Sequence, residues 1–69
     1  MIRMTRGDHF RHLRLLDEAG GKQLCEVTKT TPDGFYYRPE DANGRLRGAP
    51  GYVLWSQAER YVELSKPGA

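Results

Sequence analysis

The chain has 69 residues and a mass of 7.9 kDa, which allows one small domain and no more. Its composition, with 38% hydrophobic and 29% charged residues, predicts a folded domain and excludes a disordered segment. The formal net charge is only +2, but basic residues prevail in 1–16 and 45–69 while acidic residues prevail in 17–44.

Several classes of protein are excluded by simple features of the chain. The longest apolar run, Tyr52–Trp55, is too short for a transmembrane helix. No apolar stretch follows the basic N-terminus, so we expect no secretory signal, no membrane partner and a cytoplasmic location. The single cysteine, Cys25, can form neither an internal disulfide nor a thiolate metal cage. We therefore expect a domain without cofactors that is held together by packing or by self-association.

Residues 9–19 are compatible with two structures. Asp8 could cap a helix that begins at the next residue. However, Asp17 and Glu18 would then lie at the negative end of the helix dipole, which is unfavourable. We therefore favour a strand over about residues 9–17, and the helix remains the alternative.

The segment 23–39 predicts a β-hairpin. Its turn, Thr31-Pro32-Asp33-Gly34, has proline at the second position and glycine at the fourth, as is typical of a type I turn. β-Branched and aromatic residues on either side of this turn predict strands at about 23–30 and 34–39.

A second turn is predicted at Asp41-Ala42-Asn43-Gly44, where Asn-Gly supplies the positive-φ pair that a tight turn needs. The glycine- and proline-rich residues that follow it indicate a long loop. Beyond the loop we expect short strands at 51–55 and 60–64. A single helical turn joins them, because Ser56 and Glu59 have the spacing of a capping box.

The order of these elements resembles that of SH3-like small barrels of the Tudor or KOW kind. The resemblance covers residues 7–64 and rests on Gly7-Asp8 before the first strand, the hairpin with its glycine-bearing turn, and the helical turn before Arg60-Tyr61-Val62-Glu63-Leu64. It implies an all-β fold, a five-stranded SH3-like barrel with one short helical turn. Residues 1–6 would form an N-terminal arm and residues 65–69 a C-terminal tail.

Strand alternation divides the large apolar side chains between a buried face and an exposed one. The predicted core consists of Leu13, Leu15, Val27, Phe35, Tyr37, Val53, Trp55, Val62 and Leu64. Tyr36, Tyr52 and Tyr61 are left as candidate surface aromatics. Such residues either shield the edges of the core or anchor a contact with a partner.

The chain offers little that indicates catalysis or metal binding. Cys25 lies in a β-branched run, so we expect a small buried hydrophobe there. Asp8, His9 and His12 are the only group with metal-ligand chemistry, but on a strand the two histidines point to opposite faces. We therefore expect two surface histidines and no metal site.

Plasmid-borne dihydrofolate reductases also share the barrel layout, and Thr31-Pro32-Asp33-Gly34-Phe35 resembles a turn of that family. The place of their Gln-Ile-Tyr active-site motif is taken here by Val53-Leu54-Trp55, so we do not expect their activity.

The favoured hypothesis is a non-enzymatic interaction module that binds a protein partner or self-associates. Its contact residues would be Tyr36, Tyr52, Tyr61, Arg38, Arg45 and Arg47. The alternative is a nucleic-acid-binding barrel with a basic patch formed by Arg3, Arg6, Arg11, Arg14, Arg38, Arg45 and Arg47. A third hypothesis is an oligomeric enzyme whose site forms only between subunits. The short chain would also suit a phage- or plasmid-encoded accessory protein.

Overall fold

The computed structural model describes residues 2–64, with Leu64 described by its backbone alone. The strands are β1 (His9–Leu16), β2 (Lys22–Thr30), β3 (Gly34–Pro39), β4 (Gly51–Leu54) and β5 (Val62–Leu64). Between β4 and β5 lie a 3₁₀ turn, η1 (Trp55–Gln57), and a short helix, α1 (Ala58–Tyr61). The predicted tail at 65–69 and the predicted core position of the Leu64 side chain lie outside this description.

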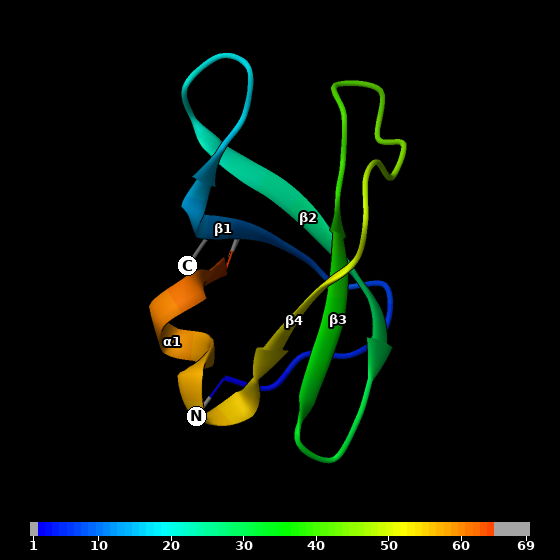
Figure 1. Cartoon of the computed structure of the whole chain (residues 1–69), viewed down its shortest axis with the longest axis vertical. Coiled ribbons are helices and arrows are strands. Elements are labelled where there is room, and N and C mark those ends of the chain that lie inside the picture. The colour runs from blue at the N-terminus through cyan, green and yellow to red at the C-terminus, as the bar shows by residue number, and fades with distance from the viewer. Residues whose placement is uncertain (1, 65–69) are drawn as a thin grey trace.

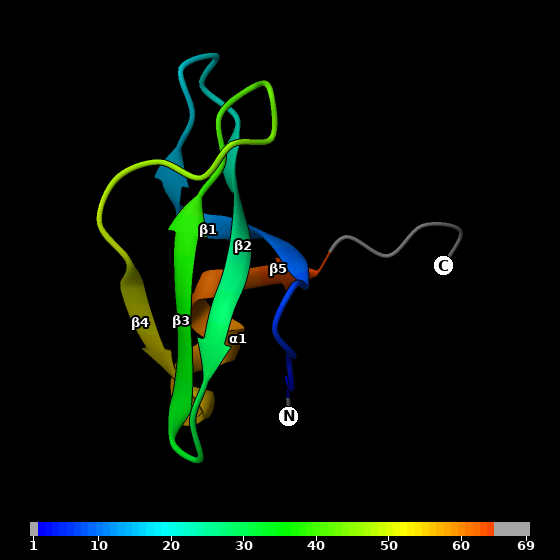
Figure 2. The ribbon, with the colours of Figure 1, turned by 90° about the vertical axis from the view of Figure 1, so that its right-hand side faces the viewer.

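The five strands form one antiparallel sheet in the order β4-β3-β2-β1-β5 (Figure 1). The predicted all-β class with one short helical segment is therefore confirmed. The β2–β3 hairpin runs the length of the molecule, with β4 beside β3 and with β1 and β5 crossing the other side (Figure 2). Among the described residues β4 and β5 do not pair, so hydrogen bonds do not close the sheet.

Residues 9–16 form a strand, and the alternative helix is wrong. The segment finds partners on both sides, since β1 pairs with β2 and with β5. The phase of the strand differs from the prediction, because Phe10 and His12 face the core while Leu13 and Leu15 are 37% and 38% exposed. β5 covers only the stretch from Phe10 to His12, and the β1–β2 register shifts between His12 and Leu16. The predicted core positions of Leu13 and Leu15 are therefore wrong.

The core lies between the curved sheet and the η1–α1 segment. Its buried members are Met4, Phe10, Cys25, Val27, Phe35, Val53, Trp55, Ala58 and Val62. Five of the predicted core residues are among them, and Tyr37 packs against the cluster in a half-buried position. Phe10 makes edge contacts with the Phe35 and Tyr37 rings, whose centroids lie 5.7 and 5.5 Å away. Edge-to-face aromatic contacts thus supply much of the packing that so short a chain can achieve.

The hairpin turn at residues 31–34 is tied to the start of η1. The indole Nε1 of Trp55 donates to the Thr31 carbonyl at 2.9 Å, and the Trp55 backbone N–H donates to the Asp33 carbonyl at 2.9 Å. The predicted capping box does not form, because η1 begins at Trp55 and neither η1 nor α1 has a side-chain cap. Because α1 extends to Tyr61, β5 begins at Val62, two residues later than predicted.

Two further turns share one geometry. In each, an aspartate (Asp17 or Asp41) accepts backbone hydrogen bonds through Oδ1 from the residues two and four positions later. The residue three positions later is a glycine with positive φ, 86° at Gly20 and 81° at Gly44. This is the three-residue hairpin loop that ends in a left-handed residue. The prediction of a positive-φ pair at Asn43-Gly44 is wrong for Asn43, since no described non-glycine residue has positive φ.

Candidate functional site

The outer surface of β3 and β4 carries two tyrosines side by side. Tyr36 and Tyr52 are direct partners across the strands, and their ring centroids lie 4.7 Å apart. Leu54, two residues beyond Tyr52 on the same face of β4, is 40% exposed. The Lys29 ammonium lies 6.0 Å from the centre of the Tyr36 ring. We call Lys29, Tyr36, Tyr52 and Leu54 the aromatic face.

One ring of the aromatic face, that of Tyr52, is held in position by its surroundings. The Tyr52 hydroxyl lies 3.1 Å from Thr31 Oγ1, at hydrogen-bonding distance. That threonine also donates to the Gly34 carbonyl and accepts from the Gly34 N–H, so the ring is tied to the hairpin turn. Fixed exposed rings lose little conformational entropy when they enter an interface.

Tyr61, the third predicted surface tyrosine, lies away from the other two. It is half-buried at the end of α1, and its ring centroid is 5.7 Å from that of His12. The Arg14 guanidinium carbon lies 5.3 Å from the centre of the Tyr61 ring. Tyr61 therefore packs against the core, and the structure does not bring it to the aromatic face.

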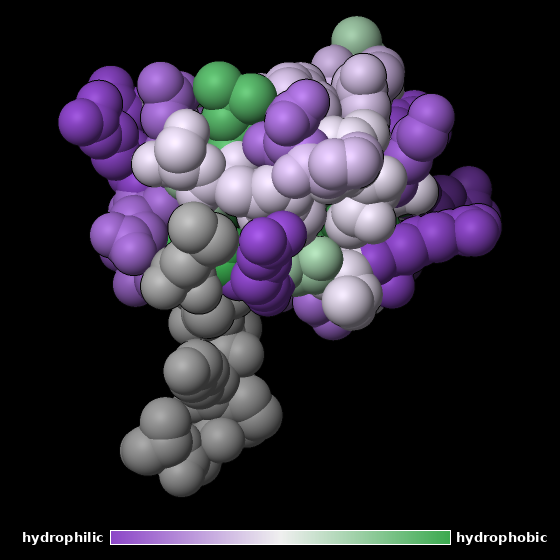
Figure 3. All heavy atoms as spheres, turned by 90° about the horizontal axis from the view of Figure 1, so that it is seen from below, coloured by the Kyte–Doolittle hydropathy of each residue, from purple (hydrophilic) through white to green (hydrophobic). Residues whose placement is uncertain are grey.

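The structure separates the predicted arginines. Arg3 lies over the Trp55 ring at 5.3 Å, while Arg38 is on the same strand face as Tyr36 and donates from Nε to the Gly48 carbonyl at 3.1 Å. Arg6 and Arg45 are exposed in turns. Figure 3 shows the molecule from below. The surface on this side is mostly hydrophilic or intermediate in hydropathy, with small separated hydrophobic areas.

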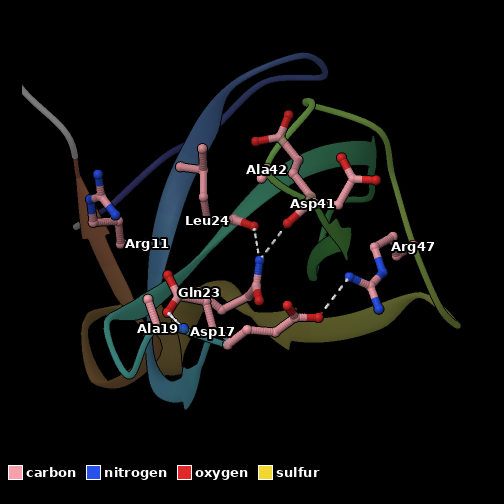
Figure 4. Close-up of a pocket in the computed structure, with 10 residues that line it drawn as sticks. Arg11, Asp17, Ala19, Gln23, Leu24, Asp41, Ala42 and Arg47 are labelled. Atoms are coloured by element: carbon pink, nitrogen blue, oxygen red, sulfur yellow. Dashed lines mark hydrogen bonds and ion pairs between the residues drawn. The ribbon is translucent and has the colours of Figure 1, made fainter.

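A hollow of about 450 Å³ opens between the two aspartate-glycine turns (Figure 4). Arg11 and Arg47 contribute positive charge to its lining. The carboxylates that oppose them are Asp17, Glu18, Glu40 and Asp41. Arg47 Nη1 lies 3.6 Å from Glu18 Oε1, so this arginine is paired with an acid. The hollow is therefore of mixed charge and does not form a basic patch.

His9, Glu26 and Glu40 meet on the outer face of the sheet, beside the hollow. His9 Nδ1 lies 3.0 Å from Glu40 Oε2, and His9 Nε2 lies 3.7 Å from Glu26 Oε1. The Glu40 side chain is only 4% exposed, against 50% for His9 and 31% for Glu26. This group does not show in the sequence, because its members come from three separate segments. Only the register that places His9 opposite Glu26 could have indicated it.

Two other residues whose side chains could act in catalysis or metal binding, His12 and Cys25, are buried. His12 is 4% exposed, so the expectation of two surface histidines is wrong for it. Burial, together with the smaller effect of the Glu40 carboxylate, raises the pKa of the Cys25 thiol to about 12. A thiol with such a pKa stays protonated at neutral pH and is a poor nucleophile.

Comparison of the chain with models of protein families, with curated proteins and with solved structures found no match in any of the three. Within residues 2–64, no helix has the length and apolar character that a membrane span requires.

Proposed function

We propose that this protein is a non-enzymatic interaction module that binds another protein through the aromatic face. The observation that carries this proposal is the exposed pair of Tyr36 and Tyr52, whose rings are in contact, beside an exposed Leu54. Tyrosine is enriched among the residues that contribute most to binding energy at protein interfaces. A second support is the hydrogen bond at Thr31, which fixes one of the rings before any partner arrives.

The charges around the aromatic face favour a partner with both acidic and apolar side chains. Lys29 lies against the Tyr36 ring, and Arg38 follows Tyr36 on the same strand face. A carboxylate at the rim of the interface could pair with either cation, while apolar side chains cover the rings. A peptide segment of this kind is the occupant that we propose.

We also propose that the domain is an SH3-like barrel in which η1 and α1 fill the gap between β4 and β5. Trp55 and Ala58 are buried, and α1 contacts β1, β4 and β5. Side-chain packing from the helical segment would then close the barrel between β4 and β5, where strand pairing is absent among the described residues.

Selection from a phage-displayed library of random peptides tests the binding proposal. We expect the enriched peptides to combine acidic and apolar residues and to shift the amide resonances of β3 and β4 in two-dimensional NMR spectra. Leu54→Thr should weaken binding by about fivefold or more, because it removes apolar contact area while introducing a β-branched residue that suits a strand.

Leu13→Thr is the matched control, since Leu13 is about as exposed as Leu54 but belongs to β1. It should leave the affinity unchanged. Failure to enrich any peptide, or equal affinity for the wild type and the Leu54→Thr variant, would contradict the proposal.

Two other measurements separate the competing functions. A sedimentation mass that rises with concentration, and that returns to the monomer value in the Leu54→Thr variant, would assign the face to a second copy of this chain. Tight binding of a labelled oligonucleotide with an affinity that falls steeply with salt would replace the proposal by nucleic-acid binding.

A further inference from the structure

We propose that His9, Glu26 and Glu40 form a binding site for a divalent transition-metal ion such as Zn²⁺. The site is independent of the aromatic face, because none of its three residues belongs to that face. Imidazole and carboxylate groups are common ligands of this class of ion, and three protein ligands leave a coordination position open for water.

The distances between the donor atoms suit a single ion. One ligand atom from each residue can be chosen so that all three lie within 4.8 Å of one another. The closest pair, His9 Nδ1 and Glu40 Oε2, is already 3.0 Å apart. Bond lengths of about 2.0–2.2 Å in a tetrahedral site place neighbouring donor atoms roughly 3.3–3.6 Å apart. Small side-chain rotations of His9 and Glu26, which are both partly exposed, would therefore complete the site.

The balance of charge around the cluster also favours a cation. Two carboxylates share one imidazole, and among residues 2–64 the ion pairs of Glu26 and Glu40 are with His9 alone. The Glu40 side chain is almost fully buried, so its negative charge is poorly compensated by water. Arg11 and Arg38 lie on neighbouring positions of the same sheet face, but neither forms an ion pair with these carboxylates. A divalent ion would neutralise both acids at once.

The backbone holds the three residues in a fixed relation. His9 and Glu26 are cross-strand partners in β1 and β2. Glu40 is anchored by its N–H, which donates to the Leu24 carbonyl at 2.9 Å, and by its carbonyl, which accepts from Gln23 Nε2 at 2.7 Å. Sites built on strands keep their geometry better than sites on loops. Glu40 also lines the hollow, which gives the ion and a bound water a route from solvent.

The experiment is isothermal titration of Zn²⁺ into the full chain after treatment with a chelator, at neutral pH. We expect one ion per chain. The dissociation constant should lie in the micromolar range, because the site has only three protein ligands and two negative charges. Co²⁺ should give visible absorption bands of a low-coordinate complex, and Mg²⁺ should bind much more weakly because it prefers an all-oxygen octahedral shell.

Three variants each remove one ligand: His9→Asn, Glu26→Gln and Glu40→Gln. Each should weaken Zn²⁺ binding by about tenfold or more and abolish the rise in unfolding temperature that the ion produces. Glu59→Gln is the matched control, because Glu59 is an exposed acid of α1 outside the cluster. The Glu26 variant keeps the test decisive if the Glu40 variant fails to fold.

Absence of a heat and of a spectral change up to millimolar ion would overturn the proposal. Undiminished Zn²⁺ affinity in the His9→Asn or Glu26→Gln variant would overturn it as well, as would Mg²⁺ binding as tightly as Zn²⁺. In those cases His9 serves only as a polar bridge between the two carboxylates.

Discussion

His12 is a buried polar residue that the structure keeps neutral. It lies between the Tyr37 and Tyr61 rings, with centroid distances of 5.3 and 5.7 Å. Its Nδ1 accepts a hydrogen bond from the Arg14 N–H at 3.1 Å, which fixes that nitrogen as an acceptor. Burial lowers the pKa of His12 below its ordinary value of 6.5, and the positive charge of Arg14 lowers this pKa further. Protonation of His12 is therefore more favourable in the unfolded chain than in the folded one.

This pKa difference predicts a loss of stability in weak acid. Neutral His12 makes its full contribution to the free energy of unfolding above about pH 6.5. This contribution declines as the pH falls below that value toward the lowered pKa of the folded state. One proton limits the slope to about 1.4 kcal/mol per pH unit. Urea unfolding of the wild type between pH 7.5 and 5 should show this decline, and His12→Phe should flatten it. A slope that is unchanged in His12→Phe, or that is lost instead in His9→Asn, would assign the effect to another group.

Two elements of the sheet, β3 and β4, come into close contact at the start of β3. A Cβ atom at Gly34 would collide with the Val53 backbone carbonyl and would lie 2.8 Å from the Tyr52 hydroxyl and ring. Only glycine fits here, because β3 and β4 approach each other at this point and the Tyr52 ring leaves no room for a side chain. The hairpin turn, the aromatic face and the beginning of η1 meet at this point.

Gly34→Ala should therefore destabilise the protein by about 2 kcal/mol or more, as overpacking against backbone does. Gly21→Ala is the control, since its nearest neighbour is Asp17 Oδ2 at 3.5 Å, an ordinary contact. Thermal unfolding followed by circular dichroism measures both variants. Equal effects of the two substitutions would show that β3 and β4 leave room for a methyl group at position 34.

At the scale of the whole molecule, the short helical segment completes the enclosure of the core. Ala58 is fully buried where α1 meets the sheet. If η1 and α1 fill the gap between β4 and β5, there is no room for a larger side chain at this position. The buried Trp55 and Val62 on either side of it leave the packing little freedom to adjust.

Ala58→Leu should accordingly lower the free energy of unfolding by about 1–3 kcal/mol. Ala49→Leu, at an exposed position in the loop before β4, should change it by less than about 0.5 kcal/mol. Chemical denaturation of the two variants gives both values. Tolerance of leucine at position 58 would indicate an open gap and would contradict the proposed barrel.

The parts of the fold that depend on neighbouring residues could be predicted from the sequence. The hairpin around Thr31–Gly34 and the turn at Asp41–Gly44 carry their own glycine, proline and aspartate signals. The inward side of β1 could not be predicted, because Phe10 and Leu13 are both apolar and only pairing with β5 decides between them. Distant partners thus overrode the local pattern.

In the candidate site too, features that neighbouring residues determine could be predicted and features that distant partners determine could not. Alternation within β3 and β4 correctly placed Tyr36 and Tyr52 at the surface, since each strand sets its own faces. The alternating pattern predicts a strand at Tyr61, but this residue ends α1 and packs inward. The meeting of His9 with Glu40 depends on two strand registers and on the path of the chain after β3. No spacing within the sequence carries that information.

The pairing of β1 with β5 also determines when the fold can form. Phe10 lies opposite Leu64, so the two ends of the described chain must meet before the core is complete. Contacts of such long sequence separation slow folding, because a large loop has to close before they contribute stability. During synthesis the β2–β3 hairpin can form while the ribosome is still at work. β1 can pair with β2 at that stage, but the core is completed only when β5 has emerged and pairs with the other side of β1.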